Sequence, residues 1–211
     1  IPLGFDLAPF QNNYDQNRKK IREKFEISED TIAIAIVGRI TGIKDHHYFL
    51  DVIQEVHQKT QKKTKIFIVG DGDMKSEIAE RIEPMTKSGI NISMTSWVFD
   101  IAEFNAGMDI MCLTSKNEGT PVSLIEAQAS NIPVISTEVG GVSDIVEQNE
   151  TGFIIPRMNK SEFVSKLQLL IENDEIRNKM KSKGWHNVYE KYSYQRLAKD
   201  MDIYYKELLN R

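Results

Sequence analysis

Short apolar runs alternate along most of this chain with stretches in which apolar residues recur every three or four positions. The run from Thr31 to Arg39 is rich in Ile and Ala, which is typical of a parallel strand buried on both faces. Residues 46–59 have the period of an amphipathic helix. Further strands are predicted at 65–70, 91–98, 108–113, 132–137 and 152–156, and further helices at 18–26, 73–87, 101–107, 121–130 and just after Gly140-Gly141. The pattern predicts an α/β fold, a Rossmann-like doubly wound parallel sheet of about six strands.

Helix starts and the two ends of the chain complete this picture. Asp45, Asp73 and Thr120 are of the residue types that cap helix N-termini, and each precedes a predicted helix.

Residues 1–17 have no period and are interpreted as the remnant of an interdomain linker, which leaves residues 18–192 as the main domain. Beyond residue 158 the pattern is helical throughout. Helices are predicted at 159–171, 173–190 and 193–210, and the last of these carries an apolar stripe of Leu197, Met201, Tyr204, Tyr205 and Leu208.

Composition excludes several classes of protein. The formal net charge is −4, with 27 basic and 31 acidic residues mixed along the chain, which argues against a nucleic-acid binder with a basic face. The single cysteine, Cys112, lies in an apolar run and is predicted to be a core residue. There is no run of about 18 apolar residues, as a membrane span requires, and no signal-peptide pattern, so we expect a cytoplasmic protein. The chain starts at Ile1 instead of Met, and we interpret it as a fragment of a longer protein.

Five loops are predicted to meet at one edge of the sheet. Ligands of open α/β sheets bind beyond the carboxyl ends of the strands, because the loops that follow the strands converge there. The polar or glycine-rich loops that follow the predicted strands are 38–44, 70–73, 98–100, 114–120 and 137–141. We expect them to line one pocket.

The segment from Thr114 to Ala127 carries the strongest chemical signal. Thr120-Pro121 is a suitable helix start, and unpaired backbone N–H groups at such a start bind anions. Gly119 allows a bulky anion to approach the backbone. Glu118 and Glu126 bracket this start, and since carboxylates are poor phosphate ligands we interpret them as acceptors for hydroxyl groups. An anion joined to a polyol is the chemical outline of a nucleotide sugar.

Two cations flank the loop after the first strand. Arg39 and Lys44 would either hold a diphosphate at the carboxyl edge or be solvated loop charges. Asp71-Gly72-Asp73 has the spacing of a metal-binding D-x-D, but a turn residue followed by a helix cap explains it better. The adjacent His46 and His47 lack the spacing of a helical zinc site.

Other catalytic motifs are absent from the sequence. No G-x-G-x-x-G follows the first strand and no G-K-[ST] occurs, which argues against a dinucleotide oxidoreductase and a P-loop NTPase. Ser115 and Ser123 lack the G-x-S-x-G setting of a hydrolase nucleophile.

Taken together, these residues resemble the C-terminal, donor-binding half of a retaining glycosyltransferase of family 4, which has the two-domain GT-B fold. The resemblance covers nearly the whole chain. IPLGFDLAPF is similar to the family's interdomain linker. The segments that follow in the family's order are VGRITGIKDHHYFLDVI, IFIVGDGDMKSEI, WVFDI and TSKNEGTPVSLIEAQASNIPVISTEVGGVSDIV.

The resemblance implies a role for each matching residue. Arg39 and Lys44 would bind the donor diphosphate without a metal or other cofactor, Glu118 would contact hydroxyls of the donor sugar, and Glu126 would contact the ribose. The remaining donor-binding residues would be Ser115, the backbone N–H groups of Gly119, Thr120 and Val122, and a base-binding surface formed by Gly70, Val98 and Phe99. Position 45 is often Gly or Asn in the family, whereas Asp45 places an additional negative charge next to the phosphate-binding Lys44.

The resemblance also implies a partner domain and a reaction. The sugar of a nucleoside diphosphate, most often UDP in this family, would move with retention to the hydroxyl of a carbohydrate or lipid-linked acceptor in polysaccharide or glycoconjugate synthesis. The acceptor would bind an N-terminal domain outside this chain, where residues 193–211 would also pack, and peripheral membrane contact would be possible. This chain alone is expected to bind donor and transfer little sugar. The alternatives are a non-catalytic nucleotide-sugar binding module, a GT-B-like epimerase or phosphorylase, and a flavodoxin-like domain.

Overall fold

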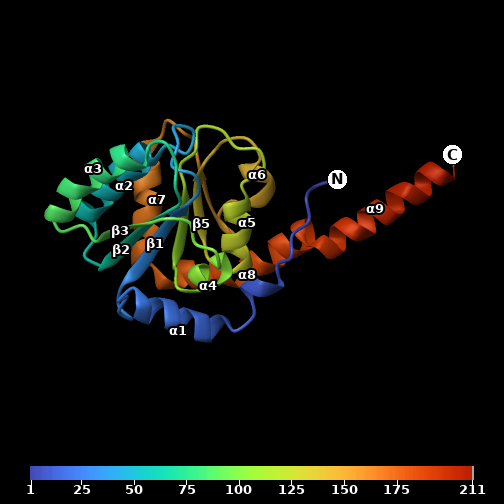
Figure 1. The fold of residues 1–211 in the computed structure, drawn as a ribbon, viewed down its shortest axis with the longest axis horizontal. Helices are drawn as coiled ribbons and strands as arrows, with labels where there is room; N and C mark the ends of the chain where they lie inside the picture. Colours follow the sequence, from blue (N-terminus) through green and yellow to red (C-terminus); the bar gives the residue numbers. More distant parts are fainter. Residues whose placement is uncertain (211) are drawn as a thin grey trace.

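The computed structural model describes residues 1–210, which form a parallel sheet covered by helices on both faces (Figure 1). Within these residues the sheet order is β3-β2-β1-β4-β5-β6, the order of the doubly wound nucleotide-binding folds. Its strands are β1 (Ile32–Val37), β2 (Thr64–Val69), β3 (Ile92–Thr95), β4 (Ile110–Leu113), β5 (Val134–Thr137) and β6 (Gly152–Ile155). Every pair of neighbours is parallel, and the longest ladder runs in register from Ile32 opposite Thr64 to Val37 opposite Val69. The fold class predicted from the sequence is confirmed.

Helices connect the strands and continue beyond the last one. They are α1 (Tyr14–Lys24), α2 (His46–Lys59), α3 (Lys75–Lys87), α4 (Ile101–Ala106), α5 (Val122–Ala129), α6 (Val142–Ile145), α7 (Lys160–Glu172), α8 (Asp174–Tyr192) and α9 (Tyr194–Leu209), after a short 3-10 turn η1 (Ala8–Phe10). The first helix begins four residues earlier than the sequence pattern indicated, and Leu7 and Phe10 ahead of it are buried in the core. The segment before residue 18 is therefore packed on the sheet domain along part of its length.

Alternation along the strands divides the core into two layers. In β1, Ile34 and Ile36 face α2, α3 and α7, whereas Ala33 and Ala35 face α1, α4, α5 and α8. The larger side chains fill the first layer, and the small alanines leave room for Phe67 and Phe104, whose ring centroids lie 5.7 Å apart. Cys112 is fully buried in the first layer, as predicted, and burial raises the pKa of its thiol.

Of the three predicted helix caps, one lies at the predicted position but makes no capping bond, and the other two are wrong. Asp45 occupies the cap position of α2, but its φ of 51° is left-handed and its side chain makes no capping hydrogen bond. The cap position of α3 is Met74 instead of Asp73, and that of α5 is Pro121 instead of Thr120. A capping oxygen reaches the next N–H groups only from the appropriate backbone angles, and these depend on how each loop packs.

Helix α9 extends away from the sheet domain (Figure 1). No residue of α9 is buried, and Tyr204, Tyr205 and Leu208 of the predicted stripe are about half exposed. Its first turn is fixed to the start of the chain, because Phe5 N–H donates to Tyr192 C=O and Tyr194 N–H donates to Phe5 C=O. Leu197 at the start of the stripe lies against Gly4, whereas Tyr204, Tyr205 and Leu208 form an exposed apolar surface on an anchored helix.

Candidate functional site

The carboxyl ends of β1 and β4 lie side by side at the point where the strand order reverses. The loop after β1 is joined to the loop after β2 because Ile40 N–H donates to Asp71 C=O at 2.9 Å. Gly70 has a φ of 144°, and a Cβ there would lie 2.0 Å from the carbonyl oxygen of Gly38. Only glycine permits this close approach of the two loops.

A second close approach joins the loops after β4 and β5. Gly141 N–H donates to the carbonyl of Gly119 at 3.1 Å. Gly140 has a φ of 49°, and a Cβ there would lie 1.7 Å from the carbonyl oxygen of Glu118. The structure therefore brings four of the five predicted loops together as two interlocked pairs, and the loop at 98–100 is not part of them.

Lys44 and Glu118 form an ion pair at this edge. The Nζ atom of Lys44 lies 2.5 Å from Oε1 of Glu118, and the side chains are 23% and 9% exposed. The hydroxyl of Ser115 donates to the same carboxylate oxygen at 2.5 Å. Two residues 74 positions apart in sequence are thereby placed in direct contact, with the carboxylate largely shielded from solvent.

The backbone around Lys44 is fixed by the loop after β4. The hydroxyl of Thr114 lies 3.0 Å from the carbonyl oxygen of Lys44 and 3.1 Å from that of Asp45. Lys116 N–H donates to Ile43 C=O at 2.7 Å, and Lys116 Nζ lies 3.5 Å from Oδ2 of Asp45. The negative charge of Asp45 is therefore directed to Lys116.

The start of α5 presents unpaired donors beside this ion pair. The backbone N–H groups of Gly119, Thr120, Val122 and Ser123 donate no hydrogen bond to another part of residues 1–210. Gly119 and Thr120 are exposed, and a Cβ on Gly119 would meet nothing within 4 Å. The helix dipole adds partial positive charge at this point, so the surface can accept an anion.

Glu126 lies one turn into α5 and is half-buried. Desolvation raises the pKa of its carboxyl group from 4.5 to about 7. No side-chain hydrogen bond or ion pair to Glu126 occurs within residues 1–210. Its oxygens remain available to a ligand.

Arg39 is exposed after β1, and it makes no ion pair with any other described residue. Of the residues expected at the base, Gly70 is buried, Val98 packs against the second core layer and Phe99 is fully exposed. The exposed Phe99 ring and the neighbouring Trp97 line a surface pocket beside the end of α1 and α4.

One residue of the D-x-D motif, Asp71, and one of the paired histidines, His47, are engaged in protein contacts. Asp71 accepts from Gly72 N–H at 2.9 Å and from Lys75 Nζ at 2.7 Å. The ring of His47 lies between Glu77 and Arg81, whereas His46 is buried with both ring nitrogens unpartnered. No group of three or more His, Cys, Asp or Glu residues suited to a metal ion occurs within the described part of the chain.

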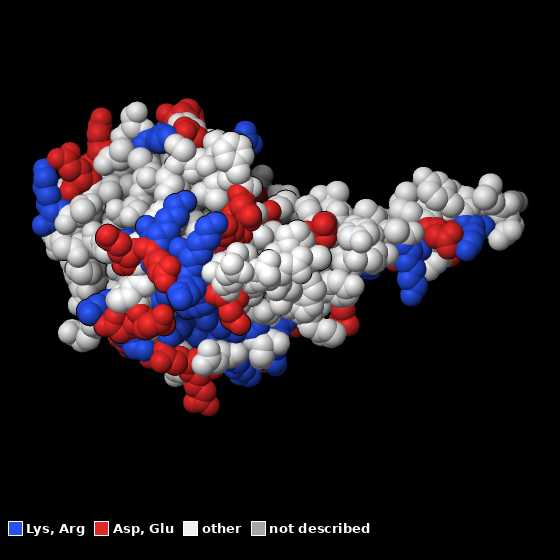
Figure 2. Space-filling model, turned by 60° about the horizontal axis from the view of Figure 1, so that its bottom comes forward, with Lys and Arg blue, Asp and Glu red and all other residues white. Residues whose placement is uncertain are grey.

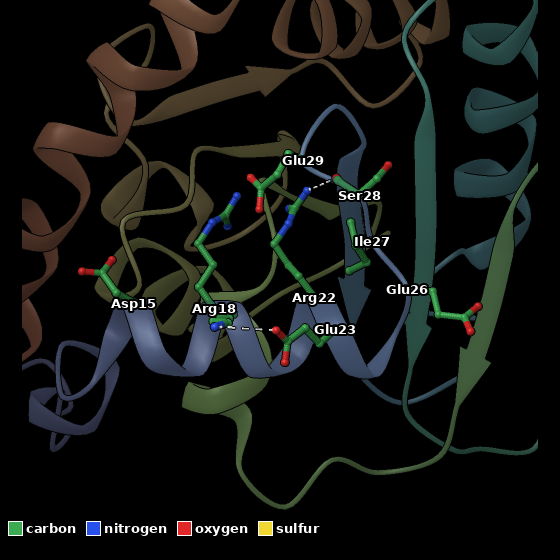
Figure 3. A pocket seen from close by; sticks show the side chains of 9 residues that line it. Asp15, Arg18, Arg22, Glu23, Glu26, Ile27, Ser28 and Glu29 are labelled. Carbon is green, nitrogen blue, oxygen red and sulfur yellow. Dashed lines mark hydrogen bonds and ion pairs between the residues drawn. The ribbon is translucent and has the colours of Figure 1, made fainter.

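A cavity of about 630 Å³ lies at the opposite, amino edge of the sheet, along α1 (Figure 3). Basic and acidic side chains are intermixed on this face (Figure 2). Its two arginines are already paired: Arg18 Nη2 lies 2.7 Å from Asp109 Oδ1, and Arg22 Nη1 lies 3.0 Å from Asp109 Oδ2. Arg22 also donates to the carbonyls of Ser28 and Thr31. This cluster, which the sequence analysis did not identify, joins α1 to the start of β4.

The chain is similar to proteins of one known family. The family described as "Glycosyl transferases group 1" matches residues 17–186. The capsular polysaccharide biosynthesis glycosyltransferase CapM of Staphylococcus aureus is 28% identical over 207 residues, which cover 98% of this chain and 53% of CapM. The Escherichia coli UDP-Gal:alpha-D-GlcNAc-diphosphoundecaprenol alpha-1,3-galactosyltransferase is 23% identical over 214 residues, which cover 100% of this chain and 54% of that enzyme. The chain thus spans about half the length of these curated relatives.

A solved structure agrees in fold. A mutant of S. aureus TarM in complex with Fondaparinux, alpha-GlcNAc-glycerol and UDP superposes with a TM-score of 0.73 at 27% identity, covering 81% of this chain and 34% of TarM. No helix within residues 1–210 has the length and apolar character required to cross a bilayer. The family match covers most of the chain and agrees with the fold, and this chain therefore belongs to the glycosyl transferases group 1 family.

Proposed function

We propose that this chain is the donor-binding domain of a retaining glycosyltransferase, and that it holds a nucleoside-diphosphate sugar, specifically a UDP-sugar, at its carboxyl edge. The observation that carries the proposal is the Lys44–Glu118 pair set beside the unpaired N–H groups of α5. A cation, a helix start and two carboxylates occur together where open α/β sheets bind ligands. The cation and the helix start can bind a diphosphate, and the two carboxylates can each accept hydrogen bonds from a group of hydroxyls, as a nucleotide sugar requires.

In this proposal each part of the donor has its own partners. Lys44 and the exposed Arg39 bind the diphosphate and stabilise it as the leaving group, with the α5 N–H groups and without a metal. Glu118 accepts hydrogen bonds from the sugar, and Glu126 accepts them from the ribose. Phe99 offers its exposed ring to the base.

The acceptor and the rest of the active site belong to a domain outside this chain. In support, the chain spans about half of its relatives, and the stripe on α9 is an exposed apolar surface beside the sheet domain. We infer that residues 1–17 lead from that domain and that residues 193–211 pack against it. The diphosphoundecaprenol in the E. coli relative's name favours a carbohydrate or lipid-linked acceptor in polysaccharide synthesis, used in the cytoplasm with peripheral membrane contact.

Calorimetric titration of this chain with UDP in the presence of EDTA tests the proposal, with GDP and ADP as comparisons. UDP should bind with EDTA present, and Lys44→Ala should weaken it by about 10- to 100-fold, the worth of one charge-assisted hydrogen bond. Arg39→Ala should also weaken it. Lys116→Ala is the matched control, because this exposed lysine of the same region pairs with Asp45 and should have little effect. Absence of nucleotide binding, or equal losses in all three variants, would contradict the proposal.

A further inference from the structure

Both protein donors to Glu118 use the same oxygen atom. Lys44 Nζ and Ser115 Oγ each lie 2.5 Å from Oε1, and no described residue donates to Oε2. A carboxylate held in this way cannot rotate freely, because rotation would break two charge-assisted hydrogen bonds. Oε2 is left as the oxygen available to a ligand.

Ser115 is itself held from the neighbouring strand. It is completely buried, and its carbonyl oxygen accepts a hydrogen bond of 2.7 Å from the hydroxyl of Thr137. Thr137 is the last residue of β5 and is also completely buried. A chain of contacts therefore runs from the end of β5 through Ser115 to the carboxylate of Glu118.

We propose that Ser115 and Thr137 are positioning residues for Glu118, so that Oε1 remains bound to the protein while Oε2 accepts a hydroxyl of the donor sugar. This inference rests on the proposed role of Glu118. It assigns the Ser115 hydroxyl to Glu118 instead of to the donor, and it adds Thr137, which no sequence motif indicated. Sugar recognition then depends on two residues that need not touch the sugar.

A purely structural role makes a different prediction. If the two hydroxyls only satisfied buried polar groups, their removal would disturb the whole loop, including the diphosphate site, and would weaken UDP and UDP-sugars equally. A positioning role changes only the sugar contribution. The informative quantity is the ratio of the dissociation constant of UDP to that of a UDP-sugar.

The experiment is calorimetric titration of this chain with UDP and then with UDP-galactose, UDP-glucose and UDP-N-acetylglucosamine. The sugar that gives wild type the largest ratio is used for the variants. Ser115→Ala should lower this ratio about tenfold, the effect expected for one hydrogen bond to a charged group, while UDP affinity stays within about twofold. Thr137→Val should lower the ratio about three- to fivefold because it acts one bond further away, and Thr137→Ser should restore it since the hydroxyl is retained.

Thr60→Val is the matched control. Thr60 is a nearly buried threonine at the opposite edge, whose hydroxyl oxygen accepts from Lys62 N–H, so the same substitution there should leave the ratio unchanged. Three outcomes would overturn the inference while leaving nucleotide binding established. The ratio could stay unchanged in Ser115→Ala and Thr137→Val, or these variants could lose equal affinity for UDP and for the UDP-sugar. The third outcome is a Thr137→Ser variant that behaves as Thr137→Val does. If wild type binds no UDP, the proposed function itself fails, and this inference fails with it.

Discussion

Glu126→Gln should stabilise the protein at alkaline pH and not at acid pH. The unfolded chain releases the Glu126 proton near pH 4.5, whereas burial delays its release in the folded chain to about pH 7. Between these values the folded state holds more protons than the unfolded state, so the free energy of unfolding falls as pH rises through this window. At about 1.4 kcal/mol for each tenfold change in proton affinity, an ionised Glu126 costs the empty site at most about 3.5 kcal/mol at pH 8, and less in proportion to its remaining exposure to solvent.

Urea denaturation at pH 4.5 and pH 8 measures this cost. Glutamine has nearly the same shape and no charge, so Glu126→Gln should match wild type at pH 4.5 and exceed it by about 1–3 kcal/mol at pH 8. Glu80→Gln, on the exposed face of α3, provides the matched control and should differ little from wild type at either pH. An equal difference between Glu126→Gln and wild type at both pH values would show that the effect is not ionisation, and the reasoning would be refuted.

The same carboxyl group predicts a proton released on nucleotide binding. If the ribose hydroxyls bind the ionised carboxylate, UDP must displace the Glu126 proton at pH 6.5, where a large fraction of the empty protein holds it. The binding enthalpy should then depend on the ionisation enthalpy of the buffer more strongly in wild type than in Glu126→Gln. Comparison of the two proteins removes the contribution of UDP's own phosphate. Identical buffer dependence in both would exclude Glu126 from the ribose site.

Three further perturbations test other parts of the structure. His46 is 2% exposed with unpartnered ring nitrogens, and burial lowers its pKa from 6.5 to about 4. The free energy of unfolding should therefore fall as pH drops below 6.5, because the unfolded chain then binds a proton that the folded chain does not. In urea denaturation, His46→Leu should lose about 2 kcal/mol less than wild type between pH 8 and pH 5. Asp109→Asn leaves the two arginines of α1 without their buried carboxylate and should lower the free energy of unfolding by about 3–5 kcal/mol at pH 7, with nucleotide affinity unchanged in the protein that remains folded. Gly140→Ala should displace the Glu118 backbone and lower UDP-sugar affinity at least tenfold by calorimetry, whereas Gly89→Ala, also at positive φ but with open space around it, should leave affinity unchanged.

Much of the fold could be predicted because it follows from local periodicity. The alternation of Ile and Ala in β1 determines which core layer each residue joins, and that pattern is visible in the sequence. The caps could not be predicted in the same way. Asp45 has a suitable residue type, but its left-handed backbone directs the carboxylate to Lys116 instead of to the helix N–H groups. The sequence shows that a residue has a side chain able to cap a helix. The direction of that side chain depends on the backbone conformation, which is determined by how the loop packs.

The candidate site shows the same division. The sequence order places Lys44 and Glu118 in loops of adjacent strands, so their arrival at one edge follows from topology. Their direct contact depends on hydrogen bonds from Thr114 and Ser115, which hold the two loops in one register. Thr137 could not be identified from the sequence, because its role consists of one side-chain bond to a backbone carbonyl 22 residues away.

The ion pair in the empty site is compatible with diphosphate binding by the same lysine. An ammonium group has three donors, and Lys44 directs one of them to Glu118, which leaves two for phosphate oxygens. Glu118 and a diphosphate are both negative, and without a cation between them their repulsion would oppose donor binding. Lys44 sits beside Glu118 in a partly shielded position, where its charge offsets both groups. Replacement by methionine would therefore do more than remove a phosphate contact, because Glu118 would then repel the donor that it is proposed to recognise.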